Sequence, residues 1–338
     1  MQSRMKILVI SDTTTLSYWL SWNFLICAIW VLMPMSVASY IIWKYEGSDY
    51  SKSERRNQQE KIQFLHDDKA WRPCLKEIHP FWLLSFRLFA FFVLLGVLVA
   101  DIIVQGAVML LYYTQWTFIL VTIYFGFGTV LSIYGCHQYY KAHTAFKAQY
   151  VGIESEQGLY VPLAYGETTY GVGAEKNLIH EKNDDFPIVG ILAHTFQVIF
   201  QMSAGAVVLT DCIYWFIIFP FLTIKDYDMN YLTVIMHTLN GVVLLLDTAL
   251  NCLKFPWFRI SYLILWTGVY VIFQWILHAC VSLGWPYPFL ELSAQYAPLW
   301  YLLVALMHIP CYGLFSLIML LKHYMLSTWF PQSYQCLR

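Results

Sequence analysis

Long apolar runs alternate with short polar segments along this chain, and the runs decide its structural class. Seven of them are long enough to cross the hydrocarbon core of a bilayer, which takes about 20 helical residues. They cover residues 19–43, 81–104, 112–135, 188–222, 231–253, 257–281 and 298–321. Backbone groups in lipid must be satisfied internally, so each run has to be a helix. We therefore predict an all-α, polytopic membrane protein, a bundle of about seven transmembrane helices.

The fourth run differs from the others in length. It is longer than a bilayer requires and contains Pro220. Proline removes a backbone donor and clashes with the preceding turn of a helix. We expect this span to be shorter than the run, or kinked.

Composition supports the same class and excludes several others. Of 338 residues, 59% are hydrophobic and only 12% are charged, against about 25% charged in soluble domains. A soluble enzyme or a disordered chain is therefore excluded. The net charge of −1 provides no basic field for nucleic acid, so we expect no nucleic-acid partner. The sequence identifies no protein partner.

The positive charges are distributed unevenly between the two sides of the predicted membrane. Only Arg4, Lys6 and Lys225 fall on the N-terminal side, and the other 17 of the 20 Lys and Arg fall on the opposite side. Positively charged loops are retained in the cytosol. The count predicts an integral protein of the plasma membrane or an endomembrane, with an extracytosolic N-terminus and a cytosolic C-terminus.

Five segments follow from these spans. Residues 1–18 form a short extracytosolic tail and 19–43 the first anchor; its apolar core exceeds the usual 7–15 residues of a cleaved signal peptide. A charged cytosolic loop, 44–80, with some helix around 53–64, leads to a six-helix membrane domain, 81–325. This domain contains a cytosolic loop, 136–187, which we interpret as a flexible linker. Residues 326–338 form a cytosolic tail. The alternative description is a six-helix core plus an N-terminal anchor helix.

The eight cysteines do not suggest a disulfide framework. Most lie within spans, and the rest lie on the side predicted to be cytosolic, so we expect reduced thiols. No Cys-x-x-Cys or His-Glu-x-x-His spacing occurs. We expect no metal site and no cofactor.

The fifth run contains most of the polar residues that fall inside the predicted membrane. At 100° per residue they lie within a sector of about 100°, bordered by Gly241. These residues, the polar stripe, are Asn230, Thr233, His237, Asn240, Asp247, Thr248 and Asn251. Polar residues in a span are expensive and often functional, but they also serve as interhelical hydrogen-bonding groups. Both interpretations of the stripe stay open.

Several polar residues lie at similar depth, toward the predicted extracytosolic side. A hydroxyl, two imidazoles and two carboxylates are thereby available to one pocket. These residues are Thr114, His237, His278, Asp101 and Glu291. Asp211 lies deeper, and His194 and His308 are interpreted as helix-packing residues. A hydroxyl with an imidazole is the minimum for nucleophilic acyl transfer.

Three short motifs resemble a known family at these same residues. They are Tyr113-Thr114-Gln115-Trp116-Thr117-Phe118, Met236-His237-Thr238 and Trp285-x-Tyr287-Pro288-Phe289-Leu290-Glu291. Over residues 81–325 the chain resembles the androgen-induced-gene family of multi-pass membrane hydrolases and, most closely, its rolling-stone-like branch. The resemblance implies hydrolysis of fatty acid esters of hydroxy fatty acids, with Thr114 as nucleophile and His237 as base.

Three functions follow as hypotheses. The first is an intramembrane lipid ester hydrolase using Thr114, or Thr117 one turn on, with His237 as base and Asn240 and His278 near the oxyanion; Asp101 and Glu291 lie nearby. Membrane lipid is then both solvent and substrate. The second is a non-enzymatic structural or adhesion-type protein, as the rolling-stone-like resemblance implies. The third is a transporter or channel, which the polar stripe supports.

Overall fold

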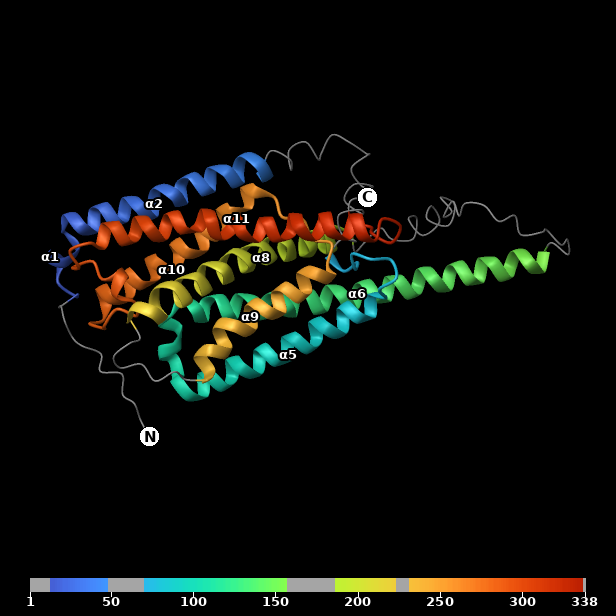
Figure 1. The fold of residues 1–338 in the computed structure, drawn as a ribbon, viewed down its shortest axis with the longest axis horizontal. Coiled ribbons are helices and arrows are strands. Elements are labelled where there is room, and N and C mark those ends of the chain that lie inside the picture. The colour runs from blue at the N-terminus through green and yellow to red at the C-terminus, as the bar shows by residue number, and fades with distance from the viewer. Residues whose placement is uncertain (1–12, 48–69, 157–185, 223–230, 337–338) are drawn as a thin grey trace.

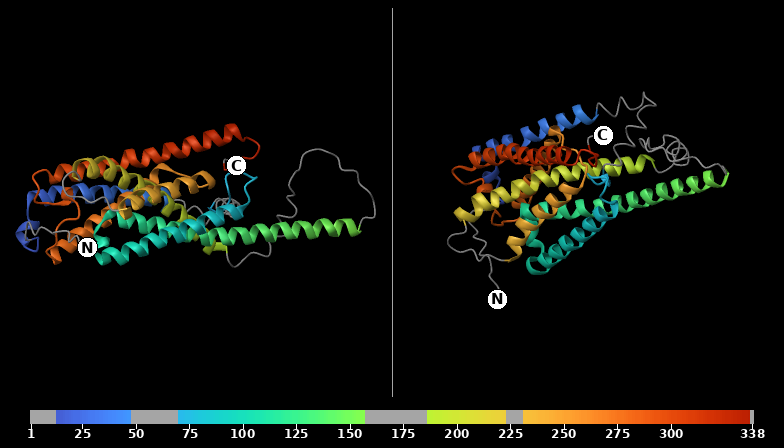
Figure 2. Two further views of the ribbon diagram at one scale, coloured as in Figure 1. Left: turned by 60° about the horizontal axis from the view of Figure 1, so that its bottom comes forward. Right: turned by 45° about the vertical axis from the view of Figure 1, so that its right-hand side comes forward.

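The structure, a computed structural model, consists of long helices packed side by side (Figures 1 and 2). It describes residues 13–47, 70–156, 186–222 and 231–336. Within these residues, seven helices are long and apolar enough to cross a membrane, and no regular strand occurs. The predicted all-α polytopic bundle is confirmed.

The helices follow the predicted apolar runs closely at most of their ends. The main elements are α1 (Leu16–Trp19), α2 (Trp22–Ile42), α5 (Pro80–Gln105), α6 (Tyr113–Glu156), α8 (Phe186–Ile213), α9 (Tyr231–Leu250), α10 (Ile260–Cys280) and α11 (Ala297–Trp329). Short π-helical or 3₁₀ turns extend or join them: η1 (Trp43–Gly47), η3 (Gly106–Leu111), η4 (Tyr214–Leu222), η5 (Trp257–Arg259) and η6 (Pro288–Leu290). We call the end of the bundle that carries η3 and η6 the η3 end.

Two helices continue past the residues at which the predicted spans or segments end. Helix α6 does not stop at residue 135 but continues for 44 residues to Glu156, and it projects beyond the bundle in Figure 1. The start of the predicted loop 136–187 is therefore helical, because residues 137–156 contain no proline and many good helix formers. Helix α11 likewise continues past residue 325 to Trp329. The helix predicted around 53–64 lies outside the described residues.

The fourth run changes helix type as its proline predicts. The α-helix α8 ends at Ile213, and the chain continues as the π-helical η4, which contains Pro220. Proline cannot donate to the preceding turn, and wider turns accommodate the missing bond. The regular part of this span is therefore shorter than the apolar run.

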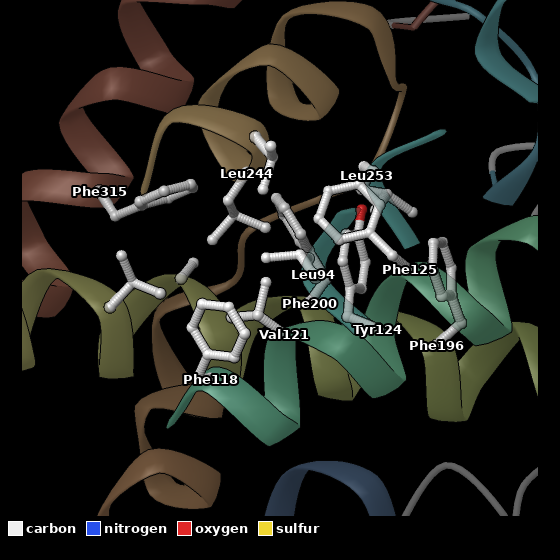
Figure 3. Close-up of a cluster of buried hydrophobic side chains, with 14 of the residues drawn as sticks. Leu94, Phe118, Val121, Tyr124, Phe125, Phe196, Phe200, Leu244, Leu253 and Phe315 are labelled. Atoms are coloured by element: carbon white, nitrogen blue, oxygen red, sulfur yellow. The ribbon is translucent and has the colours of Figure 1, made fainter. Parts of the chain in front are cut away.

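The main apolar cluster lies between α5, α6, α8, α9 and α11. Figure 3 shows Phe118 and Tyr124 of α6 against Phe200 of α8, with Leu244 of α9 and Phe315 of α11 nearby. The rings of Tyr124 and Phe196 stack with centroids 4.8 Å apart. Helix α2 lies outside this cluster and packs on α10 and α11 instead.

A fully buried ion pair joins α5 to α9. The Nε of Arg87 donates to Oδ1 of Asp247 at 2.8 Å, and both side chains are 0% exposed. A second guanidinium nitrogen donates to the carbonyl oxygen of Ala70 at 2.8 Å and to Oγ of Ser132 at 2.9 Å. Asp247 also accepts hydrogen bonds from the Tyr124 hydroxyl and from Asn251 Nδ2. The pair is thus hydrogen-bonded on both partners.

Removing one member of this pair leaves an uncompensated buried charge. We expect Arg87→Met or Asp247→Leu to lower the free energy of unfolding by about 3–5 kcal/mol. The double variant Arg87→Met/Asp247→Leu buries no charge and recovers most of that loss. Denaturant unfolding in detergent micelles measures this, with Arg72→Met, an exposed arginine, as the control. If the single and double variants lose the same free energy of unfolding, Arg87 and Asp247 do not stabilise each other as a buried ion pair.

A disulfide at the opposite end of the bundle corrects the cysteine prediction. Cys252, after α9, is bonded to Cys336, in the C-terminal segment, with their Cα atoms 5.1 Å apart. Backbone pairing of Pro73 with Asn251 and of Leu75 with Tyr334 brings the two segments together. The prediction of reduced thiols is wrong for this pair. Disulfides are rare in the reducing cytosol. This pair therefore favours an extracytosolic position for the C-terminal segment, whereas the count of positive charges predicts a cytosolic one.

Thiol counting tests the disulfide directly. In cells quenched with acid and then denatured, a maleimide-polymer reagent is expected to label the six free cysteines before reduction and all eight after it. Cys336→Ser releases Cys252 and gives the same number of labels with or without reductant. Cys74→Ser, the control, lowers both counts by one and keeps the difference. Eight labels before reduction would show that the bond is absent in the cell.

Candidate functional site

A cavity enclosing about 480 Å³ of space, part of it open to the outside, lies at the η3 end of the bundle. Thr114 from α6 and His237 from α9 both line it, so the structure brings the two predicted catalytic residues to one space. The remaining lining residues are Tyr113, Leu209, Thr210, Ile213, Tyr214, Ile218, Thr267, Tyr270, Val271, Tyr287, Phe289, Leu290 and Val304.

The His237 ring is held between two residues of the fourth span. It is 6% exposed and stacks on Tyr214 with ring centroids 3.7 Å apart and planes 9° from parallel. Its Nδ1 lies 3.5 Å from Oδ1 of Asp211, and neither atom has a hydrogen-bond partner. The carboxylate therefore faces the imidazole at ion-pair distance.

Gly241 permits this close approach of α8 to α9. A Cβ at this position would lie 3.3 Å from Oδ2 of Asp211, tighter than an ordinary van der Waals contact. Sequence reasoning placed Gly241 beside the polar stripe but placed Asp211 deeper in the membrane, apart from His237. The one available signal was that a carboxylate inside an apolar run is costly and needs a reason.

Thr114 is the second residue of α6, where the first backbone N–H groups have no partner within the helix. The hydroxyl of Tyr287 meets this helix end and accepts the Tyr113 N–H at 3.1 Å. Burial raises the pKa of Tyr287 to about 12, so this hydroxyl keeps its proton at neutral pH and is available as a donor.

Thr117, the alternative nucleophile, occupies a different environment. It is fully buried, and its Oγ1 lies 3.1 Å from Oγ1 of Thr210. Thr210 donates its own proton to the carbonyl oxygen of Ala206 at 2.7 Å, so in this pair Thr117 is the donor. Thr117 is not among the residues that line the cavity.

The other four predicted site residues lie outside the cavity wall. Asn240 is buried on α9, its Oδ1 accepts the Gly241 N–H, and its Nδ2 has no partner. His278 stacks on Trp285 at 3.9 Å and is hydrogen-bonded through Nδ1 to the carbonyl oxygen of Gln274.

The two carboxylates of that group have local partners. Asp101 is buried on α5 and accepts a hydrogen bond from Gln105 of the next turn. Glu291 accepts one from Ser293 at 2.7 Å. The structure thus does not gather the full predicted set around Thr114 and His237.

No group of three or more His, Cys, Asp or Glu side chains is placed to hold a metal ion within the part of the chain that the structure describes. The cavity wall offers the Thr114 hydroxyl and the His237 imidazole, with the Asp211 carboxylate next to the imidazole.

No family model, curated protein or solved structure matches the chain. The resemblance carried by the three motifs therefore stays a prediction. The motifs do meet in space, because Thr114, His237 and Tyr287 each come from a different one and all line the same cavity.

Proposed function

We propose that this multi-pass membrane protein is an intramembrane hydrolase of lipid esters. Thr114 is the nucleophile, His237 is the general base and acid, and Asp211 positions His237. The observation that carries the proposal is the cavity lined by both Thr114 and His237, where the imidazole Nδ1 faces a half-buried carboxylate. The family resemblance supports the same two residues.

The reaction proceeds in two balanced halves. Thr114 Oγ1 attacks the ester carbonyl carbon while His237 takes its proton; the C–O bond to the alcohol then breaks, and His237 gives the proton to the leaving oxygen. This leaves an acyl ester on Thr114. Water attacks that ester, again losing a proton to His237. The bond to Thr114 breaks, the threonine oxygen regains the proton, and a carboxylic acid is released.

Electrostatics at the cavity suit this sequence of charges. A carboxylate 3.5 Å from Nδ1 stabilises the imidazolium that forms during each proton transfer. The N-terminus of α6 carries partial positive charge, and the protonated Tyr287 hydroxyl lies beside Thr114. Both favour negative charge developing on oxygen at this point. The largely apolar wall suits a substrate that arrives from the bilayer.

Paired threonine variants test the nucleophile. We expect Thr114→Ala and His237→Ala to lower hydrolysis of a fatty-acyl ester panel in proteoliposomes by at least about 100-fold. Thr117→Ala, one helical turn away and outside the cavity, is the matched control and retains activity. Thr114→Ala also abolishes labelling by a fluorophosphonate probe. Labelling and hydrolysis that survive both Thr114→Ala and His237→Ala would overturn the proposal, and no hydrolysis by a folded wild-type protein would favour the non-enzymatic type.

A charge-removing change at the carboxylate tests its positioning role. We expect Asp211→Asn to lower kcat by about 10²–10⁴-fold with KM little changed, because Asp211 does not line the cavity. Asp101→Asn is the control, since Asp101 is a buried carboxylate of the same bundle and does not line the cavity. The role assigned to Asp211 fails if Asp211→Asn and Asp101→Asn have the same kcat.

A further inference from the structure

A second cavity adjoins the candidate site. It encloses about 560 Å³ of space, part of it open to the outside, and lies between α2, α10, α11 and η6. The two cavities share five wall residues, which form the boundary between them: Thr267, Val271, Phe289, Leu290 and Val304. A molecule whose reactive group lies at Thr114 therefore has this second space beside it.

The hydroxyl and imidazole groups on the wall of the second cavity are already hydrogen-bonded. His308 interacts through Nδ1 with the carbonyl oxygen of Val304 at 2.8 Å, which makes Nδ1 the donor and leaves Nε2 to accept from Thr267 Oγ1 at 2.9 Å. The Thr267 oxygen in turn accepts from the Tyr113 hydroxyl at 2.8 Å. Tyr301 donates to the carbonyl oxygen of Leu290 at 3.0 Å.

The rest of this wall is apolar apart from the indoles of Trp30 and Trp300, and this composition determines which ligand chemistry the second cavity favours. A polar headgroup entering it would lose its hydration and find these donors and acceptors occupied, which is unfavourable. A hydrocarbon chain has no hydrogen bonds to water to lose there, and it gains van der Waals contact with the wall. The first cavity differs, because His237 on its wall has an unpartnered Nδ1.

Helix α2 supplies one wall of the second cavity through Trp30, Val31 and Pro34. This helix lies outside residues 81–325. It fits closely against α10 at Gly268, where a Cβ would lie 2.4 Å from the sulfur of Met35. The cavity is therefore left open beside a tight contact between the same two helices, and does not result from loose packing along their whole length.

We propose that the second cavity binds the hydrocarbon tail of a fatty-acyl chain. As a substrate subsite it rests on the proposed function, with the ester at Thr114 and the tail extending past Thr267 toward α2. Chain binding itself requires no catalysis. The helix that precedes the six-helix domain thus helps to set which chain lengths are accepted.

A photoreactive fatty acid with a diazirine at its terminal carbon tests chain binding in lipid nanodiscs. We expect crosslinks on the cavity-facing residues of α2 and α11, and at least about a tenfold loss in Val31→Phe, which fills the space. Val37→Phe is the matched control, because Val37 is on the same helix and 52% exposed; its crosslinks are unchanged. Ala305→Leu fills the opposite wall with a smaller side chain and is expected to act like Val31→Phe.

Crosslinks spread evenly over lipid-facing residues, or a yield insensitive to both filling variants, would overturn the proposal. Hydrolysis provides an independent reading: Val31→Phe is expected to favour shorter acyl chains, losing about fourfold for each methylene that no longer fits, while Val37→Phe keeps the wild-type preference. Specific crosslinks without any hydrolysis would refute the proposed function and leave the chain site standing. Hydrolysis together with non-specific crosslinks would support the proposed function and refute the chain site.

Discussion

The buried ion pair between Arg87 and Asp247 is the constraint on which the rest of the bundle depends. An arginine and an aspartate inside a low-dielectric bundle are stable only together and only when their remaining groups are hydrogen-bonded. Arg87 of α5 can form its hydrogen bonds only if Asp247 of α9, the carbonyl oxygen of Ala70 and Ser132 of α6 all lie around its guanidinium group. This requirement sets the depth and the rotation of α5, α6 and α9 relative to one another. The rotation of α9 is then fixed along its whole length, including at His237.

The polar stripe of α9 consequently has two roles. At one end, Asp247 and Asn251 belong to the ion-pair network, which is structural. At the η3 end, His237 faces the cavity and Asp211. Between them Leu244 packs into the apolar cluster seen in Figure 3. Helical periodicity reports which face of a helix is polar, but it cannot distinguish these two roles, because each depends on partners far away in the sequence.

Much of the fold could be predicted because bilayer thickness constrains it. The spans follow from apolar length, and their alternation places Thr114 and His237 at the same end. What the sequence could not supply were pairings that depend on packing. Asp211 meets His237 because Gly241 lets α8 approach α9, and Cys252 meets Cys336 across 84 residues because the segments around Pro73 and Leu75 pair with both. Hydropathy could not predict that α6 continues beyond its apolar run. It indicates where the membrane ends, and a helix can continue past that point.

Helix α2 packs at the side of the bundle and forms one wall of the second cavity. Polar contacts secure both ends of its segment: Thr13 Oγ1 donates to the carbonyl oxygen of His278 at 2.8 Å, and Arg259 Nε donates to Oε1 of Glu46 at 2.8 Å. Pro34, on the cavity wall, removes one intrahelical hydrogen bond, and prolines are where helices bend. The two contacts hold α2 against the bundle on both sides of the cavity wall that it supplies.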